Sequence, residues 1–385
     1  MKLCVSLQTE PCVRLKWYSK QHWNNAMTLT ISKVQARPVM APLARPISTA
    51  QVSIPKAPLV LFDIETHDGI VGRSYIFAYT PLILRALVDF AEDLAETLID
   101  EPATPLDVAA RMFKQFALLG RQGVVGMVLA GIDMALWDIA ARARDCSVAQ
   151  LLGAEHKPLL CYDSQGVFVP GRDEHLVEDT LARGFRAVKF KLGFETAQED
   201  LAALKIIRDM IGPDMPLMLD FNQSLTAPEA IRRIRLFEDS GIDLSWVEEP
   251  VPAEDFAGYQ MVRANVSTPI QSGENWWHPE DAARAIQAGT TDYAMPDLVK
   301  IGGFTGWQRA APIAQAASIP VSSHLFIEAS THALAATSNA HYLEFMDIAG
   351  SLLVDPYALE NGCLTPRGPG LGIEWNEDVV SANLA

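Results

Sequence analysis

The sequence predicts an α/β protein in which a closed barrel of alternating strands and helices follows a smaller α+β unit. Two observations predict this arrangement. Residues 29–65 read as strands and residues 81–150 as helices, whereas from residue 158 short apolar runs alternate with helical patterns. The chain of 385 residues is long enough for one barrel and one smaller domain.

The N-terminal residues divide into a tail and the start of the smaller unit. Residues 1–26 contain four lysines or arginines, two tryptophans and a single acid. We interpret them as a tail that is disordered or that stems from a mis-assigned start. Strand-like runs follow at 28–34 and 57–65, and an apolar, proline-rich segment, 40–54, separates them.

Helical patterns complete this unit, which we place at residues 27–150. Leucines and one phenylalanine recur at three- and four-residue steps between Leu82 and Leu98. A second long helical pattern runs from Gly126 to Arg144. Strands followed by helices predict an α+β domain here.

Eight apolar runs predict the barrel strands within residues 151–355. Pro228 and Pro279 stand where first helical turns begin, and Gly184 and Gly241 stand where helices end. The alternative is an open doubly wound sheet, but no GxGxxG motif follows any strand. The predicted strands are 159–165, 187–191, 217–221, 245–250, 270–274, 293–297, 320–324 and 342–346.

The composition limits the partners and the location of the protein. The chain has 31 basic and 47 acidic residues, a net charge of −16, which argues against a nucleic-acid partner. The longest uncharged stretch, 310–327, contains prolines, serines and a histidine, so we predict no membrane span. The five cysteines are scattered without a CxxC spacing, which favours a reducing, cytoplasmic location.

Ionisable side chains stand at the ends of the predicted barrel strands. Because the C-terminal ends of parallel strands meet at one mouth of a barrel, we expect these groups to converge there. One acid after a strand is commonly a helix N-cap, but a circle of such groups indicates an active site. The groups are Lys191, Asp220, Glu248, Glu274, Asp297, His324 and Glu344.

Three acids on consecutive strands, Asp220, Glu248 and Glu274, predict a metal site. Crowded carboxylates repel one another and raise their own pKa values unless a cation lies between them. Oxygen ligands with open positions suit Mg²⁺, with Mn²⁺ as a substitute. The alternative is three separate surface salt bridges.

Two candidate bases lie on different strands. Lys189 and Lys191 point to the same face of one strand, so burial and mutual repulsion would lower the pKa of Lys191 and make it a proton acceptor. His324 lies on the strand next to Asp297, whose carboxylate would fix the imidazole tautomer. The alternative for the lysines is a structural role in the barrel core.

Glu344 is the remaining acid. In an apolar pocket its carboxyl group would stay protonated and donate a hydrogen bond to an oxyanion, whereas the alternative is a salt bridge to an arginine. Together the groups suit abstraction of the proton next to a carboxylate, with a metal-stabilised enediolate. Two opposed bases would racemise the substrate, and one base with one acid would eliminate water from it.

Short motifs along the chain from residue 27 resemble the mandelate racemase subgroup of the enolase superfamily. Each motif is weak alone, but the combination is very specific. The motifs are GRSYIFAY (72–79), AGIDMALW (130–137), VKFK (188–191), LDFN (219–222), WVEEP (246–250), SGEN (272–275), MPD (295–297), KIGG (300–303) and SSHLF (322–326).

This resemblance implies a capping α+β domain over a modified TIM barrel, (β/α)7β, with residues 356–385 returning to the cap. It implies Mg²⁺ on the three carboxylates, Lys191 as the base for one enantiomer, and the His324–Asp297 dyad as the base for the other. It also implies a homo-oligomer, commonly an octamer.

The resemblance further implies contacts to the substrate. Lys189 and Ser164 would bind its carboxylate, Asn222 its α-hydroxyl, and Glu344 the enediolate. By strand alternation Glu249 points to the other face of its strand, and its role stays open.

A lid loop at 47–54 and an aryl pocket are also implied. The pocket residues are apolar or aromatic, as an aryl substrate needs. Arg45 stands where the subgroup has tyrosine, and it either favours a polar or acidic substrate or is a solvated loop charge. The pocket residues are Ile47, Ile54, Phe77, Tyr79, Leu325 and Met346.

The leading hypothesis is a Mg²⁺-dependent racemase of mandelate or a similar aryl 2-hydroxy acid. An acid-sugar dehydratase of the same subgroup is the alternative, but it usually has polar lid residues. A non-catalytic metal- or ligand-binding barrel is a remote alternative, because none of the expected bases is missing.

Overall fold

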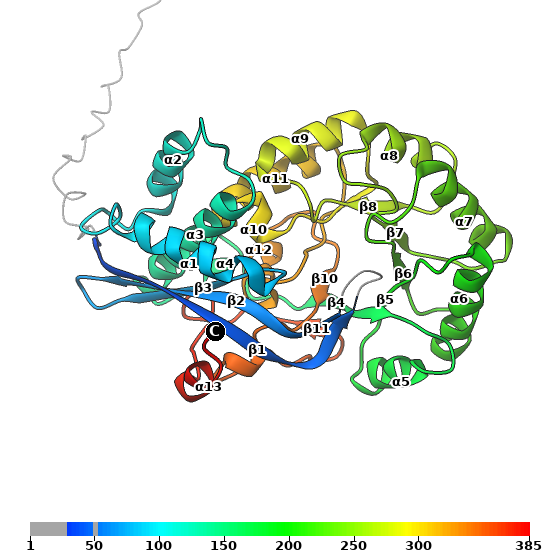
Figure 1. Ribbon diagram of the computed structural model, residues 1–385, viewed down its shortest axis with the longest axis horizontal. Coiled ribbons are helices and arrows are strands. Elements are labelled where there is room, and N and C mark those ends of the chain that lie inside the picture. Colours follow the sequence, from blue (N-terminus) through cyan, green and yellow to red (C-terminus); the bar gives the residue numbers. More distant parts are fainter. Residues whose placement is uncertain (1–28, 49–52) are drawn as a thin grey trace, which may run out of the picture.

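The computed structural model describes residues 29–48 and 53–385 (Figure 1). The predicted tail, 1–26, lies outside the described residues, and so does the middle of the predicted lid, 47–54.

A three-stranded antiparallel sheet forms the base of the cap. Its strands are β1 (Ile31–Ser48), β2 (Ser53–Thr66) and β3 (Val71–Phe77), in that spatial order. The proline-rich segment belongs to this sheet, because Met40 pairs with Pro58, and Ile47 pairs with Ile54 beyond a shift in register. The prediction of two short strands was therefore wrong in length. β1 is an edge strand, where missing N–H groups are tolerated.

Helices cover this sheet and join it to the barrel. The longest, α3, packs against β2 and β3 and also contacts α10 and α11 of the barrel. By length and composition α3 could cross a membrane, but most of it is buried inside the structure, as in a core helix. The cap helices are η2 (Pro81–Ile83), α1 (Leu84–Ala95), α2 (Pro105–Gln115), α3 (Val124–Arg142) and α4 (Val148–Leu151).

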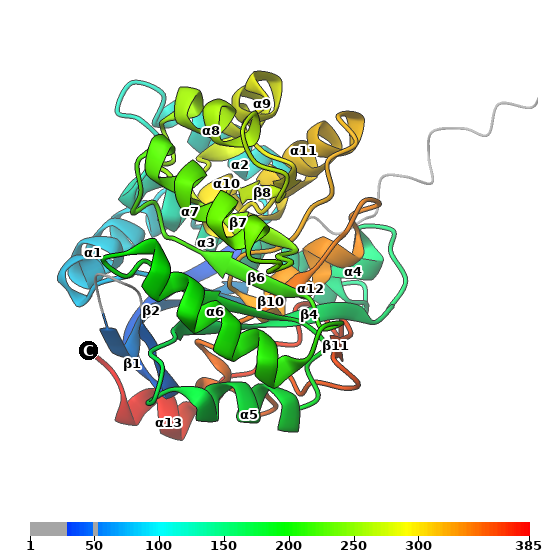
Figure 2. The same ribbon diagram turned by 90° about the vertical axis from the view of Figure 1, so that its right-hand side faces the viewer.

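The barrel alternates parallel strands with helices that form an outer layer (Figures 1 and 2). Its strands pair in the order β10-β4-β5-β6-β7-β8-β9. In Figure 2, α6, α7 and α8 lie in a row outside β6 and β7, and their apolar side chains share one core with these strands. The strands are β4 (Leu159–Val167), β5 (Val188–Lys191), β6 (Leu217–Asp220), β7 (Trp246–Glu248), β8 (Ile270–Ser272), β9 (Tyr293–Ala294) and β10 (Leu343–Phe345).

The helices follow the strands in the predicted places. Pro228 and Pro279 lie in first helical turns, and Gly184 and Gly241 have the positive φ of helix ends. The helices are α5 (Glu174–Ala182), α6 (Ala197–Ile211), α7 (Ala227–Asp239), α8 (Phe256–Arg263), α9 (His278–Ala288), α10 (Leu298–Ile301), α11 (Gly303–Ala316) and α12 (Ile327–Ala335).

The seventh predicted strand, 320–324, makes only isolated bridges. Val321 bridges to Ala294 on one side and Ala340 on the other, and His324 bridges to Asp297. This segment therefore fills the gap between β9 and β10, so the strands close into the predicted barrel.

The C-terminal segment returns to the cap. It contains η3 (Gly350–Leu352), β11 (Cys363–Leu364) and α13 (Glu377–Ala382). The N–H of Met40 donates to the carbonyl of Asn383 (2.9 Å), and Arg37 pairs with Glu377. Figure 1 shows α13, in red, close to β1. The chain end thus braces β1, the strand that leads into the predicted lid.

Candidate active site

The three predicted metal ligands lie at the same end of the barrel. Asp220 and Glu248 are the last residues of β6 and β7 and pair in register, and both are fully buried. Glu274 follows Gly273, where a side chain would collide with the backbone of Met295. Burial raises the pKa of Glu248 to about 7, and the charges of Asp220, Glu344 and Glu274 contribute to this rise. The carboxylates are therefore close enough to act on one another.

Lysine ammonium groups accompany these acids. Lys189 forms ion pairs with Glu248 and with Glu344 (3.0 Å), and Lys191 lies 2.6 Å from Asp220. Within residues 29–48 and 53–385, no group of three or more His, Cys, Asp or Glu side chains has a geometry that could hold a metal ion directly. A set of buried carboxylate oxygens at adjacent strand ends nevertheless has the chemistry that a hard divalent cation prefers.

Lys191 is well positioned, but its pKa differs from the prediction. Its Nζ donates to Asp220 Oδ2 and to Asn222 Oδ1 (2.9 Å). Burial and Lys189 lower the pKa of Lys191, as expected, but the charges of Asp220 and Glu274 and the hydrogen bond to Asp220 together raise it more, so the net pKa is raised. The predicted depression was wrong for this arrangement, because strand alternation brings Lys191 to the carboxylate as well as to Lys189.

The predicted histidine–aspartate pair is present. His324 Nδ1 lies 2.7 Å from Asp297 Oδ2, and Asp297 is fully buried. The other oxygen of Asp297 accepts the N–H groups of Val299 (2.7 Å) and Lys300 (3.0 Å) at the start of α10. Burial lowers the pKa of His324, but Glu274, Glu344 and Asp297 raise it to about 9. One carboxylate thus caps a helix and orients the imidazole.

Glu344 does not lie in an apolar pocket, so that prediction was wrong. It lies 3.0 Å from Lys189 and accepts the N–H of Leu325 (2.8 Å). Burial raises the pKa of Glu344, but Lys189 and His324 lower it more, and the net pKa falls. Glu344 is therefore a carboxylate in this arrangement.

A network that the sequence analysis missed joins the cap to the predicted metal ligands. Asn275 donates to both oxygens of Glu249 (3.0 and 2.8 Å) and accepts from Lys300 Nζ (2.6 Å). Lys300 also lies 5.0 Å from the centre of the Tyr79 ring. Glu249 has a positive φ, which ends strand alternation, so the prediction that it faces away was wrong. Asn275 and Lys300 belong to the motifs SGEN and KIGG, so the sequence did contain a signal for this network.

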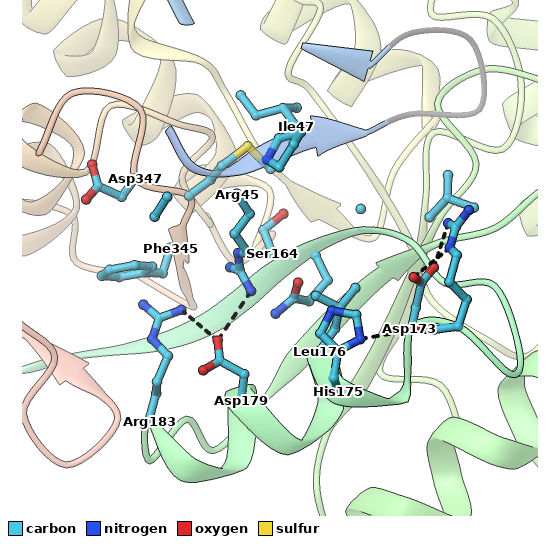
Figure 3. A pocket seen from close by; sticks show the side chains of 17 residues that line it. Arg45, Ile47, Ser164, Asp173, His175, Leu176, Asp179, Arg183, Phe345 and Asp347 are labelled. Carbon is cyan, nitrogen blue, oxygen red and sulfur yellow. Dashed lines mark hydrogen bonds and ion pairs between the residues drawn. The ribbon is translucent and has the colours of Figure 1, made fainter. Parts of the chain in front are cut away.

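A hollow of about 570 Å³ adjoins these groups at the ends of β4 and β10 (Figure 3). Three of the expected substrate contacts, Ile47, Ser164 and Met346, line it. Of the six expected pocket residues, the four others are not in its wall. Among them Phe77 and Tyr79 contact each other with tilted rings whose centres are 4.6 Å apart, Leu325 is buried, and Ile54 pairs with Ile47.

Comparison with known families accounts for most of the chain. Residues 31–153 match the N-terminal domain described as mandelate racemase / muconate lactonizing enzyme. Residues 173–379 match the domain described as enolase C-terminal domain-like. The observed cap and curled barrel are the architecture of these families, which confirms the predicted fold class.

Two relatives show the range of reactions among similar proteins. D-Galactarolactone cycloisomerase from Agrobacterium fabrum is 31% identical over 364 residues, 88% of this chain and 94% of that protein. L-Talarate/galactarate dehydratase from Salmonella typhimurium is 28% identical, over 83% of this chain and 82% of that protein. The reactions named for these relatives support membership of this chain in the enolase superfamily. Its membership of the mandelate racemase subgroup stays a prediction.

Solved structures are also similar. An enolase from Bradyrhizobium, complexed with magnesium and mandelic acid, has a TM-score of 0.91 and 45% identity, covering 94% of this chain and 99% of that one. L-Talarate dehydratase from Polaromonas, complexed with Mg and L-glucarate, has a TM-score of 0.85 and 28% identity, covering 93% and 98%.

Proposed function

The chain belongs to the mandelate racemase/muconate lactonizing enzyme family of the enolase superfamily, and on that premise we propose that it is a Mg²⁺-dependent racemase of an aryl 2-hydroxy acid. The observation that carries this proposal is the presence of two candidate bases at one barrel mouth. Lys191 contacts Asp220 at the end of β6, and the His324–Asp297 pair lies between β9 and β10. Since β4 and β10 separate the two bases around the barrel, they approach the mouth from different sides.

In this proposal the protein moves one proton away and returns one from the other side. Lys191 Nζ, in its neutral form, takes the α-proton of one enantiomer, and the protonated imidazole of His324 delivers a proton from Nε2 to the opposite face. Asp297 keeps the proton of the imidazole on Nδ1, so that Nε2 is the atom that exchanges. The other enantiomer reacts by the same steps in reverse.

Asp220, Glu248 and Glu274 would hold Mg²⁺, and magnesium in the similar structures supports this assignment. When bound, Mg²⁺ supplies positive charge that stabilises the substrate carboxylate as it becomes more negative. Lys189 would bind that carboxylate, and Glu344 would orient Lys189. Asn222, which contacts Lys191, would bind the α-hydroxyl.

Apolar residues favour an aryl substrate. Ile47 and Met346 line the hollow beside Ser164, and the mandelic acid bound to the Bradyrhizobium protein fits this interpretation. The second candidate is an acid-sugar dehydratase, which the named dehydratases among the relatives favour. A cytoplasmic homo-oligomer stays a prediction.

Proton NMR in D₂O tests the proposal. Each enantiomer of mandelate is incubated with the protein and Mg²⁺, and loss of the α-proton signal is followed together with optical rotation. Loss of both signals from both enantiomers supports a racemase. A 2-keto-3-deoxy product from glucarate, without exchange of mandelate, would instead establish the dehydratase.

A further inference from the structure

The hollow beside the catalytic centre has a charged wall that the proposed reaction does not use. Its apolar and hydroxyl side, with Ile47, Ser164 and Met346, continues the substrate site. Its other side carries Arg45 from β1 and Arg183 from the end of α5. Figure 3 shows both arginines extending toward Asp179. A small aryl acid offers these arginines no partner.

Both guanidinium groups have unused N–H groups among the described residues. Arg45 Nη2 donates to the buried Asp163 (2.9 Å), whereas its Nη1 is buried without a hydrogen-bond partner. Arg183 lies 3.8 Å from Asp163 and 4.0 Å from Asp179, which are ion-pair distances too long for hydrogen bonds. Its guanidinium lies over the ring of Phe345. A buried donor without an acceptor, such as Arg45 Nη1, is costly, and the neighbouring Arg183 side chain is 34% exposed and makes no hydrogen bond within the described residues, so the pair is suited to receive an oxyanion.

Ser164 supplies a third unused donor in the same wall. Its hydroxyl is buried and has no hydrogen-bond partner within residues 29–48 and 53–385. Ser164 lines the same hollow as Arg45 and Arg183. The hollow therefore joins the expected substrate contact to the arginine pair.

The other charges of the wall already have partners. Arg172 pairs with Asp173 (2.8 Å), and His175 Nδ1 lies 3.1 Å from the carbonyl of Arg172. Asp347 accepts the N–H groups that follow it, including that of Gly350 (2.6 Å). Asp179 is the remaining acid, and its side chain is 53% exposed, 3.9 Å from Arg45 and 4.0 Å from Arg183. Asp179 can thus turn into solvent when a ligand takes its place.

We infer that this hollow is a second, anion-binding subsite, and that the natural substrate is a 2-hydroxy acid with another carboxylate at its far end. Arg45 and Arg183 would bind that carboxylate by charge-assisted hydrogen bonds, which are stronger than neutral ones. The inference rests on the proposed function and deepens it, since the reaction at the α-carbon is unchanged. Mandelate would occupy the reacting end and leave the subsite empty.

A substrate series tests this inference. The initial rate of α-proton exchange in D₂O with Mg²⁺ is measured for 4-methylmandelate and for 3- and 4-carboxymandelate. We expect kcat/KM for at least one carboxymandelate to exceed that for 4-methylmandelate by about 10- to 100-fold, as expected for charge-assisted hydrogen bonds. Equal values for the methyl and both carboxyl compounds, with exchange present, would overturn the subsite and leave the racemase standing.

Matched variants test whether the preference for a carboxyl substituent depends on Arg183. Arg183→Met should lower the carboxyl-to-methyl ratio of kcat/KM by about 10-fold or more, and Asp179→Asn should raise it, because a competing carboxylate is removed. Arg172→Met is the control, since Arg172 lines the same hollow but is paired with Asp173. A fall in the ratio with Arg172→Met as large as with Arg183→Met would overturn the assignment to Arg183.

Glucarate, a diacid, distinguishes a failure of the proposed racemase function from a failure of the inferred subsite. Dehydration of glucarate without exchange of any mandelate would refute the racemase and support the subsite, provided that Arg183→Met lowers glucarate turnover. Turnover of glucarate that is insensitive to Arg183→Met would refute both. Absence of any reaction with mandelates and glucarate would refute the proposed function, and with it the inferred diacid substrate.

Discussion

Replacing Asp297 with asparagine should disable one of the two proton transfers. Asp297 uses one oxygen for two backbone N–H groups of α10 and the other for His324 Nδ1 (2.7 Å). The amide oxygen of an asparagine is the acceptor that the helix start needs, so its NH₂ group would face the imidazole. Nδ1 must then accept a hydrogen bond, and the proton moves to Nε2. The atom that exchanges protons with the substrate is thereby blocked.

The expected loss is large and affects one enantiomer. Forcing a catalytic histidine into the wrong tautomer costs about 10⁴-fold in rate in enzymes that depend on such a pair. We therefore expect Asp297→Asn to reduce exchange from the enantiomer served by His324 by about 10⁴-fold. Exchange from the enantiomer served by Lys191 should persist in a single-turnover measurement, because Lys191 lies on a different strand.

The assay is α-proton exchange in D₂O with each enantiomer of mandelate separately. Thermal unfolding of the variant provides the control, since the helix start keeps its two hydrogen bonds. A loss that is equal for both enantiomers, or a loss below about tenfold for the affected one, would refute the tautomer reasoning.

The same structure leads to four further predictions. Lys191→Ala should have the opposite enantiomer preference to Asp297→Asn, and equal loss for both enantiomers in the exchange assay would contradict the two-base assignment. Removal of divalent cations with EDTA should abolish exchange, and added Mg²⁺ should restore it; exchange that survives dialysis against EDTA would contradict the metal assignment. Burial raises the pKa of Asp133 to about 7, and its Oδ1 has no partner among the described residues. The stability that this raised pKa contributes is fully present below about pH 4 and is lost as the pH rises through 7, so Asp133→Asn should be more stable than the parent at pH 9 by up to about 4 kcal/mol, or about 5 °C. Equal melting temperatures of the two proteins at pH 9 would contradict this prediction. Asp138→Asn on the same helix should instead destabilise the protein, because Arg142 would lose its buried partner.

The sequence by itself determined the fold class and indicated the candidate reacting groups. The alternation of apolar runs with helical patterns is local, and seven of the eight predicted runs contain a strand. Charged residues at the strand ends could be recognised because parallel strands of a barrel expose their C-terminal ends together. That is why Lys191, Asp220 and His324 were found without coordinates. The true length of β1 was missed because proline usually interrupts strands, and only its place at the sheet edge permits it.

Only the tertiary structure decided the electrostatics of these groups. The pKa of Lys191 depends on a balance between burial, Lys189 and Asp220, and the charge state of Glu344 depends on Lys189 from another strand. The orientation of Glu249 depends on one backbone angle that alternation does not predict. The pairing of Arg45 with Asp163 joins residues 118 positions apart. The electrostatic effects depend on the distances between the charges and on their burial, so they become known only when the chain has brought the charges together.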